Sequence, residues 1–272
     1  MIRLLALDLD GTVLGPGKEI APAGRAALRA AERLGVHVAL ATGRMLRSAA
    51  AVRDRLGLHG PLLCYNGGLV RLPDGGGWTD PVPLDVAQAV GALCRQRGYF
   101  LQAYLGDDLV VPCEDGRAEA YAALAGVSYT VDSAVAYAPP RPPTKLLVIE
   151  PAERQAEVRQ ALAGVAAGRL ELANSYPHYL EISRLGVDKG AALARLAEAL
   201  GVARSEVMAV GDGENDLPML RYAGVAAAVA NAAPGVAAAA DFGCGAPFGD
   251  GVAEAVRRYI PGTEAEGGVR VG

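Results

Sequence analysis

The sequence predicts an α/β fold: a doubly wound, mostly parallel sheet with a separate α+β unit inserted into it. Short, continuously apolar runs such as residues 2–7 and 36–41 are typical of strands buried on both faces of a parallel sheet. Helical patterns that end at a glycine follow them, which is the βα alternation of such a sheet. The alternation stops after about residue 82 and resumes at residue 189, which indicates the insertion.

The first part of the chain, residues 1–82, is predicted to consist of consecutive βα units. An Ala-, Leu- and Arg-rich helix from about residue 23 ends at Gly35 and returns the chain to the second strand. The further elements expected here are a helix at 45–56, a strand at 62–65 and a hairpin at 69–78 with three consecutive glycines between its arms.

Residues 83–185 have a different pattern and are predicted to form the inserted α+β unit. Its expected order is a helix, two short strands around residues 106–108, a helix, a proline-rich bend at 139–143, a strand at 145–149, a helix and two strands. Mixed short strands and helices of this kind do not continue the βα alternation, so we expect this unit to have its own sheet.

The third part, residues 186–272, resumes the first pattern, so the two outer parts are predicted to form one core. Its expected elements are a helix from 189 to 200, a strand at 207–210, an acidic turn, a helix, a strand at 225–229, a helix and a last helix near 252–259. The Ala-rich stretch 223–240 contains Asn231 and Pro234 and is predicted to be a strand, a turn and a short helix instead of a membrane span. We expect the Gly-rich tail, residues 262–272, to be frayed.

Composition limits the function classes. With 272 residues, 51% of them hydrophobic and 21% charged, the chain is long enough to bury a core and to hold one large domain plus an insert. The net charge is −4, and basic residues are not interleaved with aromatic ones, which argues against nucleic-acid binding. Four separate cysteines, a short acidic start and no apolar span predict a cytoplasmic protein without a membrane partner. The sequence leaves the oligomeric state open, and we expect a monomer or small homo-oligomer.

Two carboxylates follow the first strand. Asp8 and Asp10 are two residues apart, so their side chains face the same way at the carboxyl end of the strand, where open α/β sheets bind ligands. Such a pair could hold a metal ion, or one member could act as nucleophile and the other as acid and base. The alternative is that both only cap turns.

Further polar groups follow other strands. Thr42, Gly43 and Arg44 come directly after the second strand and suit a phosphate group, although this segment taken alone favours an N-cap Thr and a turn Gly. The strand at 207–210 runs into the acidic turn 211–216, so three strands end in polar residues at one edge. Lys189 opens a helix, where the dipole disfavours a cation; an anionic neighbour would explain it, and a solvated surface position is the alternative.

Other phosphate and metal motifs are incomplete. Gly17 and Lys18 lack the first glycine and the hydroxyl residue of a P-loop. The acidic turn has Leu217 and Ala223 at the positions where a calcium-binding loop needs glycine and glutamate. The three histidines have no zinc-ligand spacing, so we interpret them as structural.

Taken in order, four segments resemble the haloacid dehalogenase superfamily of phosphatases. They are residues 8–12 (DLDGT), residues 41–44 (ATGR), Lys189 and residues 211–216 (GDGEND). Within this superfamily the chain resembles the Cof-type branch (type IIB), whose α/β C2 cap lies between the second and third motifs, as residues 83–185 do here. Residues 65–68 (YNGG), 180–182 (LEI), 186–190 (GVDKG) and 231–232 also resemble that branch. The resemblance implies a Rossmann-like core, residues 1–82 and 186–272, with a cap that determines substrate specificity.

The resemblance also implies roles for individual residues. Asp8 would be the nucleophile that forms an aspartyl-phosphate, and Asp10 the acid and base. Thr42 and Lys189 would hold the phosphoryl oxygens together with the Gly11 and Gly43 amides and Asn215. Arg44 and, in the cap, Glu181 would reach the substrate. Mg²⁺ would be bound by Asp8, the Asp10 main-chain carbonyl, Asp212 and Asp216.

The implied function is a Mg²⁺-dependent phosphatase that hydrolyses small phosphomonoesters, such as sugar phosphates or related metabolites. Two alternatives stay open. A phosphomutase or phosphotransferase would pass the same aspartyl-phosphate to a hydroxyl group instead of water. A non-catalytic module would bind a phosphorylated ligand without turnover, against which the complete set of motif residues argues.

Overall fold

The computed structural model describes residues 1–166 and 168–263, so most of the tail for which fraying was predicted lies outside the described residues. The chain divides into two compact units. The first, which we call the core, comprises Met1–Gly43, Ala49–Gly77 and the chain from Asp188 onward. The second, which we call the cap unit, comprises Arg44–Ser48 and Trp78–Val187.

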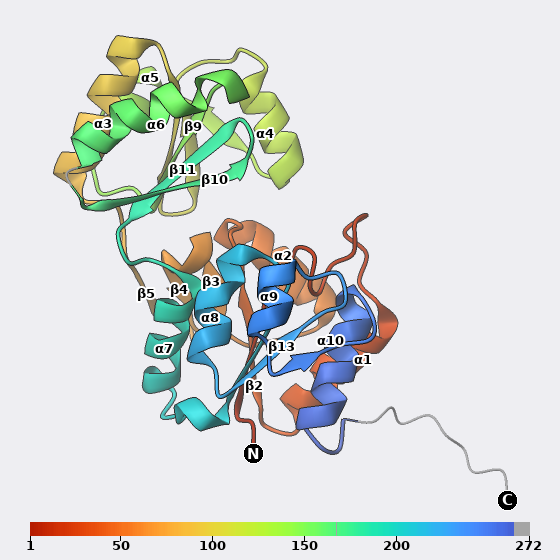
Figure 1. Cartoon of the computed structure of the whole chain (residues 1–272). Coiled ribbons are helices and arrows are strands. Elements are labelled where there is room, and N and C mark those ends of the chain that lie inside the picture. The colour runs from red at the N-terminus through yellow and green to blue at the C-terminus, as the bar shows by residue number, and fades with distance from the viewer. Residues whose placement is uncertain (167, 264–272) are drawn as a thin grey trace, which may run out of the picture. The chain divides into compact units, whose positions relative to one another are not determined.

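The core contains an eight-stranded sheet in the order β14-β13-β12-β1-β2-β3-β4-β5 (Figure 1). The strands from β14 to β3 are parallel, and β4 pairs antiparallel with β3. The strands are β1 (Leu4–Leu7), β2 (His37–Ala41), β3 (Leu62–Cys64), β4 (Leu69–Arg71), β5 (Gly77–Thr79), β12 (Val207–Gly211), β13 (Val225–Ala228) and β14 (Phe242–Gly243).

The order of the sheet strands reverses at β1. The chain proceeds from β1 to β2 and β3 on one side, and from β12 to β13 and β14 on the other. Because such crossovers are right-handed, helices after β1 and β2 lie on one face and helices after β12 and β13 on the opposite face. The crevice at the carboxyl ends of β1 and β12 is therefore the topological switch point, where open α/β sheets bind ligands.

Helices cover both faces of this sheet. The helices of the core are α1 (Pro22–Arg33), α2 (Leu46–Leu56, whose first three residues belong to the cap unit), α7 (Lys189–Ala199), α8 (Leu217–Tyr222), α9 (Pro234–Ala239) and α10 (Phe248–Tyr259). Helix α1 packs against α10, and α7 packs against α8. Pro22 occupies the first turn of α1, and Ala27, Leu28 and Ala31 form its buried stripe. All four residues of β1 are fully buried, which explains its continuously apolar sequence.

The cap unit has its own six-stranded sheet in the order β10-β11-β9-β6-β7-β8. The elements are α3 (Leu84–Arg97), β6 (Phe100–Leu105), β7 (Asp108–Val111), α4 (Arg117–Ala125), β8 (Tyr129–Val131), α5 (Ser133–Tyr137), β9 (Lys145–Ile149), α6 (Gln155–Ala166), β10 (Leu170–Tyr176) and β11 (Tyr179–Arg184). Figure 1 shows α3 and α6 on one side of this sheet, and their apolar side chains form a core with alternate residues of β6, β9 and β11.

The predicted fold class is confirmed: an α/β core with a doubly wound, mostly parallel sheet and an inserted α+β unit. Several elements differ from the prediction. Strands β8 and β14 and helix α5 were not predicted, because runs of two to five residues carry too little pattern. The last helix begins at Phe248 instead of near residue 252, because Gly249 and Gly251 conceal its first turn in the sequence.

The stretch 223–240 folds as β13, a turn and α9, as predicted. Within the described residues, none of the helices combines the length and the apolar character that crossing a bilayer requires. The four cysteines are free thiols.

We expect Leu5→Ala in β1 to lower the free energy of unfolding of the core by about 2–5 kcal/mol, because it leaves a cavity in a fully buried strand. The matched control is Leu34→Ala, since the Leu34 side chain is 54% exposed at the end of α1. Urea unfolding followed by circular dichroism measures both. Equal losses in the two variants would contradict the central position of β1.

Candidate active site

The sheet register brings three polar segments to one edge. Leu7 at the end of β1 lies opposite Leu40 of β2 and Val210 of β12. The residues that follow, Asp8 in one loop, Thr42 in the second and Asp212 in the third, therefore leave the sheet at the same level. Their convergence results from parallel pairing of three buried strands.

Lys189 is the first residue of α7, and its side chain is fully buried. The preceding residue, Asp188, caps the helix by accepting a hydrogen bond from the Ala191 amide at 2.7 Å. The Lys189 ammonium lies 2.6 Å from Asp8 Oδ1 and 2.6 Å from Asp216 Oδ1. Of the two alternatives for Lys189, a solvated surface position and an anionic neighbour, the structure shows the second. Its ammonium lies between two carboxylates.

The acidic turn after β12 is fixed by its own backbone. Asp216 is fully buried, and its Oδ2 accepts hydrogen bonds from the amides of Asp212 at 2.9 Å and Gly213 at 3.0 Å. Asp212 accepts a hydrogen bond from the Thr12 hydroxyl at 2.6 Å. These contacts hold the Asp212 and Asp216 carboxylates at fixed positions in the turn.

Asp8, Asp212, Asp216 and Lys189 form a group that we call the acidic cluster, and its charges do not balance. Burial raises the pKa of Asp8 to about 7; the Lys189 ammonium opposes this rise and Asp216 adds to it. Burial also raises the pKa of Asp212. Burial alone would lower the pKa of Lys189, yet the Asp8 and Asp216 carboxylates raise it to about 12. Three acids around one ammonium therefore favour the binding of a further cation.

The donor set fits a hard divalent cation. One carboxylate oxygen of each of Asp8, Asp212 and Asp216 lies within 4.8 Å of the others. Asp8 Oδ2 is buried and has no hydrogen-bond partner among the described residues, so this oxygen is available for a ligand. All the donors are oxygen atoms, which Mg²⁺ prefers.

Gly11 makes room for this cluster. It has a φ of +94°, and a Cβ at this position would lie 2.2 Å from Asp212 Oδ2. The Gly11 amide donates to the Leu14 carbonyl at 3.1 Å, within the loop. Its predicted contact with a phosphoryl oxygen would compete with this hydrogen bond and stays a prediction.

The other predicted core residues lie in loops at the same edge of the sheet. Asp10 is exposed, and Thr42 is buried, with its amide donating to the Leu63 carbonyl. Asn215 is exposed and donates to Asn66 Oδ1 at 3.2 Å, and a Cβ on Gly43 would lie 3.3 Å from that same oxygen. These residues stand in the loops that follow β1, β2, β3 and β12.

Two predicted substrate contacts belong to the cap unit and not to the core. Arg44 is half-buried in the segment Arg44–Ser48. Glu181 lies on β11, where its Oε1 is 3.4 Å from the Lys145 ammonium. The contacts of both residues with a substrate remain predictions.

Comparisons with known proteins decide the family. A family model described as haloacid dehalogenase-like hydrolase matches residues 5–256. The chain belongs to this family. The predicted superfamily is thereby confirmed.

Individual relatives of the hydrolase match along nearly their whole length. A phosphoglycolate phosphatase of Methanothermobacter thermautotrophicus is 30% identical over 260 residues, which are 95% of this chain and 99% of that protein. A 5-amino-6-(5-phospho-D-ribitylamino)uracil phosphatase of Bacillus subtilis is 29% identical over 259 residues, 95% of this chain and 96% of that protein. TM0651 from Thermotoga maritima, whose crystal structure is known, shares 32% sequence identity with this chain. The two structures superpose with a TM-score of 0.88, and the match covers 95% of this chain and 97% of that one.

Sequence reasoning assigned no role to three residues that position the site of the hydrolase. Thr12 holds Asp212, and Asn66 pairs with Asn215 across two loops. Asn231 donates to the Gly11 carbonyl at 2.8 Å and accepts from the Phe248 amide at 2.9 Å. All three occur in segments that carry the family resemblance, but their contacts lie between loops that are far apart in the chain.

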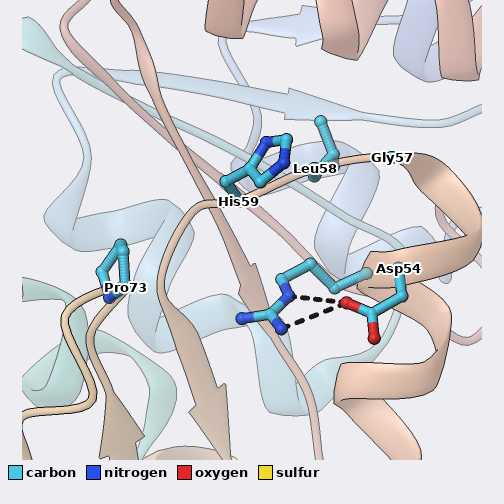
Figure 2. A pocket seen from close by; sticks show the side chains of 6 residues that line it. Asp54, Gly57, Leu58, His59 and Pro73 are labelled. Atoms are coloured by element: carbon cyan, nitrogen blue, oxygen red, sulfur yellow. Dashed lines mark hydrogen bonds and ion pairs between the residues drawn. The ribbon is translucent and has the colours of Figure 1, made fainter.

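Figure 2 shows a surface pocket of the core, whose lining residues lie toward the amino end of β3 and so away from the carboxyl ends of the parallel strands. It is lined by Arg53, Asp54, Gly57, Leu58, His59 and Pro73. These residues belong to the end of α2, the approach to the amino end of β3 and the chain after the antiparallel β4. Arg53 and Asp54 pair with each other at 3.1 Å. The pocket includes no member of the acidic cluster and is not the candidate active site.

We expect Lys189→Met to lower the free energy of unfolding by about 3–5 kcal/mol without added divalent cations, because it leaves Asp8 and Asp216 buried without their counter-charge. The control is Arg3→Met, which breaks an exposed ion pair with Glu206 and costs at most about 1 kcal/mol. Denaturant unfolding measures both. Similar small losses would mean that the buried ammonium is not needed to hold the two carboxylates.

Proposed function

We propose that the chain is a Mg²⁺-dependent phosphatase that hydrolyses small phosphomonoesters through an aspartyl-phosphate on Asp8. The observation that carries this proposal is the acidic cluster at the topological switch point. In it Lys189 holds Asp8 Oδ1, and Asp8 Oδ2 is buried with no hydrogen-bond partner in the described part of the chain. Relatives named as phosphatases along the whole chain support it.

In the proposed first step, an Asp8 carboxylate oxygen attacks phosphorus, and the bond from phosphorus to the ester oxygen breaks. Asp10 donates a proton to that leaving oxygen. The Lys189 ammonium neutralises charge on the phosphoryl oxygens, and Thr42 and the Gly43 amide orient them. In the second step Asp10 takes a proton from water, which attacks the aspartyl-phosphate and releases phosphate.

Mg²⁺ would be held by Asp8, Asp212 and Asp216 together with the Asp10 main-chain carbonyl, and it would neutralise phosphoryl charge during in-line transfer. Lys189 keeps Asp8 oriented whether or not the ester is present. Asp216 accepts two backbone hydrogen bonds through Oδ2 and a hydrogen bond from the Lys189 ammonium through Oδ1, so it keeps Lys189 in place. The residues of the chain thus hold the nucleophile in advance of the reaction.

Asp8→Asn should lower phosphate release from p-nitrophenyl phosphate by at least about 10³-fold, because an amide cannot form the acyl phosphate. The matched control is Asp54→Asn on α2, an exposed carboxylate that pairs with Arg53. Release is measured with Mg²⁺ and again with EDTA. Equal release by the parent and Asp8→Asn would show that another group is the nucleophile.

Mg²⁺ should also stabilise the fold, because it binds the native cluster and not the unfolded chain. At a concentration of 100 times its Kd the expected gain is about 2.7 kcal/mol, measured by urea unfolding. Asp212→Asn should remove most of this gain, whereas Asp54→Asn should retain it. An unchanged gain in Asp212→Asn would place the cation elsewhere.

Product analysis separates hydrolysis from transfer. A phosphatase releases inorganic phosphate in proportion to the alcohol, whereas a phosphotransferase yields a phosphorylated acceptor. A protein that binds phosphate esters with Mg²⁺ but never turns them over would be the non-catalytic module. A cytoplasmic location and a monomer or small homo-oligomer remain predictions.

A further inference from the structure

The loop that follows β3, residues 65–68, has a strained backbone. Tyr65, Asn66 and Gly67 have φ angles of +54°, +54° and +105°, so three consecutive residues are in the left-handed region. Tyr65 is also buried, and a left-handed conformation is rare for so bulky a side chain. Strain of this kind persists where the surrounding structure holds a segment in place, and it is typical of ligand-binding sites.

Backbone contacts of this loop reach two of the proposed phosphoryl-binding segments. The Asn66 amide donates to the Thr42 carbonyl at 2.9 Å. Gly67 lies against the start of α7, where a Cβ on it would be 2.4 Å from the Asp188 carbonyl oxygen. Asp188 directly precedes Lys189. The loop therefore contacts both the segment that carries Thr42 and the helix that begins with Lys189, and all of these residues belong to the core.

The Asn66 side chain reaches a third segment, the acidic turn after β12. Its Oδ1 accepts a hydrogen bond from Asn215 Nδ2 at 3.2 Å. The same amide group lies over Gly43, since a Cβ there would be 3.3 Å from Asn66 Oδ1 and 3.4 Å from Asn66 Nδ2. One side chain thus joins the loop after β2 to the loop after β12.

The hydrogen bond to Asn66 orients a side chain that is otherwise exposed. Asn215 is exposed, whereas Asn66 is half-buried. Asn215 Nδ2 carries two hydrogens, and Asn66 Oδ1 accepts one of them, which fixes the direction of the other. On the other side of its amide, Asn215 Oδ1 lies over Gly213, where a Cβ would be 2.8 Å away. Orienting the amide in advance removes part of the entropy that it would lose on binding a ligand.

We propose that Asn66 is a positioning residue for phosphoryl binding, which aims the second Nδ2 hydrogen of Asn215 at a phosphoryl oxygen. This inference rests on the phosphoryl-binding part of the proposed function. Asn66 acts through Asn215 and does not itself contact the ligand. Asparagine suits this position because it adopts the left-handed conformation more readily than most residues and carries an acceptor oxygen on a short side chain.

Asn66→Gly separates the side chain from the backbone. Glycine adopts the same φ without strain, so the amide of residue 66 still donates to the Thr42 carbonyl, while the acceptor for Asn215 is lost. The readout is the Kd of inorganic phosphate in the presence of Mg²⁺, measured by isothermal titration. We expect Asn66→Gly to weaken phosphate binding by about two- to tenfold, which is the cost of ordering one free side chain.

A double-mutant cycle tests whether this effect passes through Asn215. Asn215→Ala should weaken phosphate binding by about tenfold or more, because a charge-assisted hydrogen bond is lost. The double variant Asn66→Gly with Asn215→Ala should bind phosphate as Asn215→Ala does, since Asn66 then has no side chain to orient.

The matched control is a second cycle, between Asn66→Gly and Thr42→Val. The losses of phosphate binding should add in this pair, because glycine keeps the backbone hydrogen bond to the Thr42 carbonyl. Additive losses in the cycle with Asn215→Ala would show that Asn66 supports only the shape of its loop, and they would overturn the inference. Unchanged phosphate binding in Asn66→Gly would overturn it as well.

Phosphate binding and turnover decide different questions. If the parent hydrolyses p-nitrophenyl phosphate, Asn66→Gly should raise KM by the factor by which it raises the Kd of phosphate, with kcat within about twofold of the parent. If the parent hydrolyses no ester but the cycle with Asn215→Ala shows the expected coupling, the proposed function fails and the inference stands. A parent that binds no phosphate with Mg²⁺ would overturn the inference, because Asn215 would then have no anion to meet.

Discussion

The site depends on two buried ion pairs, which the Lys189 ammonium makes with Asp8 and Asp216. A fully desolvated cation is tolerated only next to anions, and Asp8 and Asp216 each lie 2.6 Å from it. It therefore links the loop after β1, the loop after β12 and the start of α7. The close approach of α7 and α8 is part of the same arrangement, since a Cβ on Gly190 would lie 2.5 Å from the Pro218 carbonyl oxygen.

The acidic cluster has more negative than positive charge in a buried setting. Burial raises the pKa of Asp8 and of Asp212, and the Asp216 carboxylate adds to both rises. Asp8 Oδ2 has no hydrogen-bond partner among the described residues. The proposed divalent cation would supply positive charge to the carboxylates, and the proposed phosphoryl group would be the electrophile for Asp8. The arrangement favours ligand binding at the expense of the stability of the empty site.

The two sheets of the chain differ in what lies on their second face. The core sheet is covered by helices on both faces, and its polar residues are confined to the strand ends. The cap sheet packs α3 and α6 on one face and carries the polar side chains of Gln102, Lys145 and Glu181 on the other.

The sequence by itself determined the βα alternation, the insertion and the strand-end positions of Asp8, Thr42 and Asp212, because buried parallel strands are continuously apolar and end at one edge. It did not determine that Lys189 is buried, since first helical residues are commonly solvated and only the packing of α7 removes water. Nor did it determine the contacts of Thr12, Asn66 and Asn231. It also did not determine that Gln102 and Glu181 both lie beside Leu147 in the cap sheet. These depend on strand register and on loops that meet only in the folded chain, about which local periodicity carries no information.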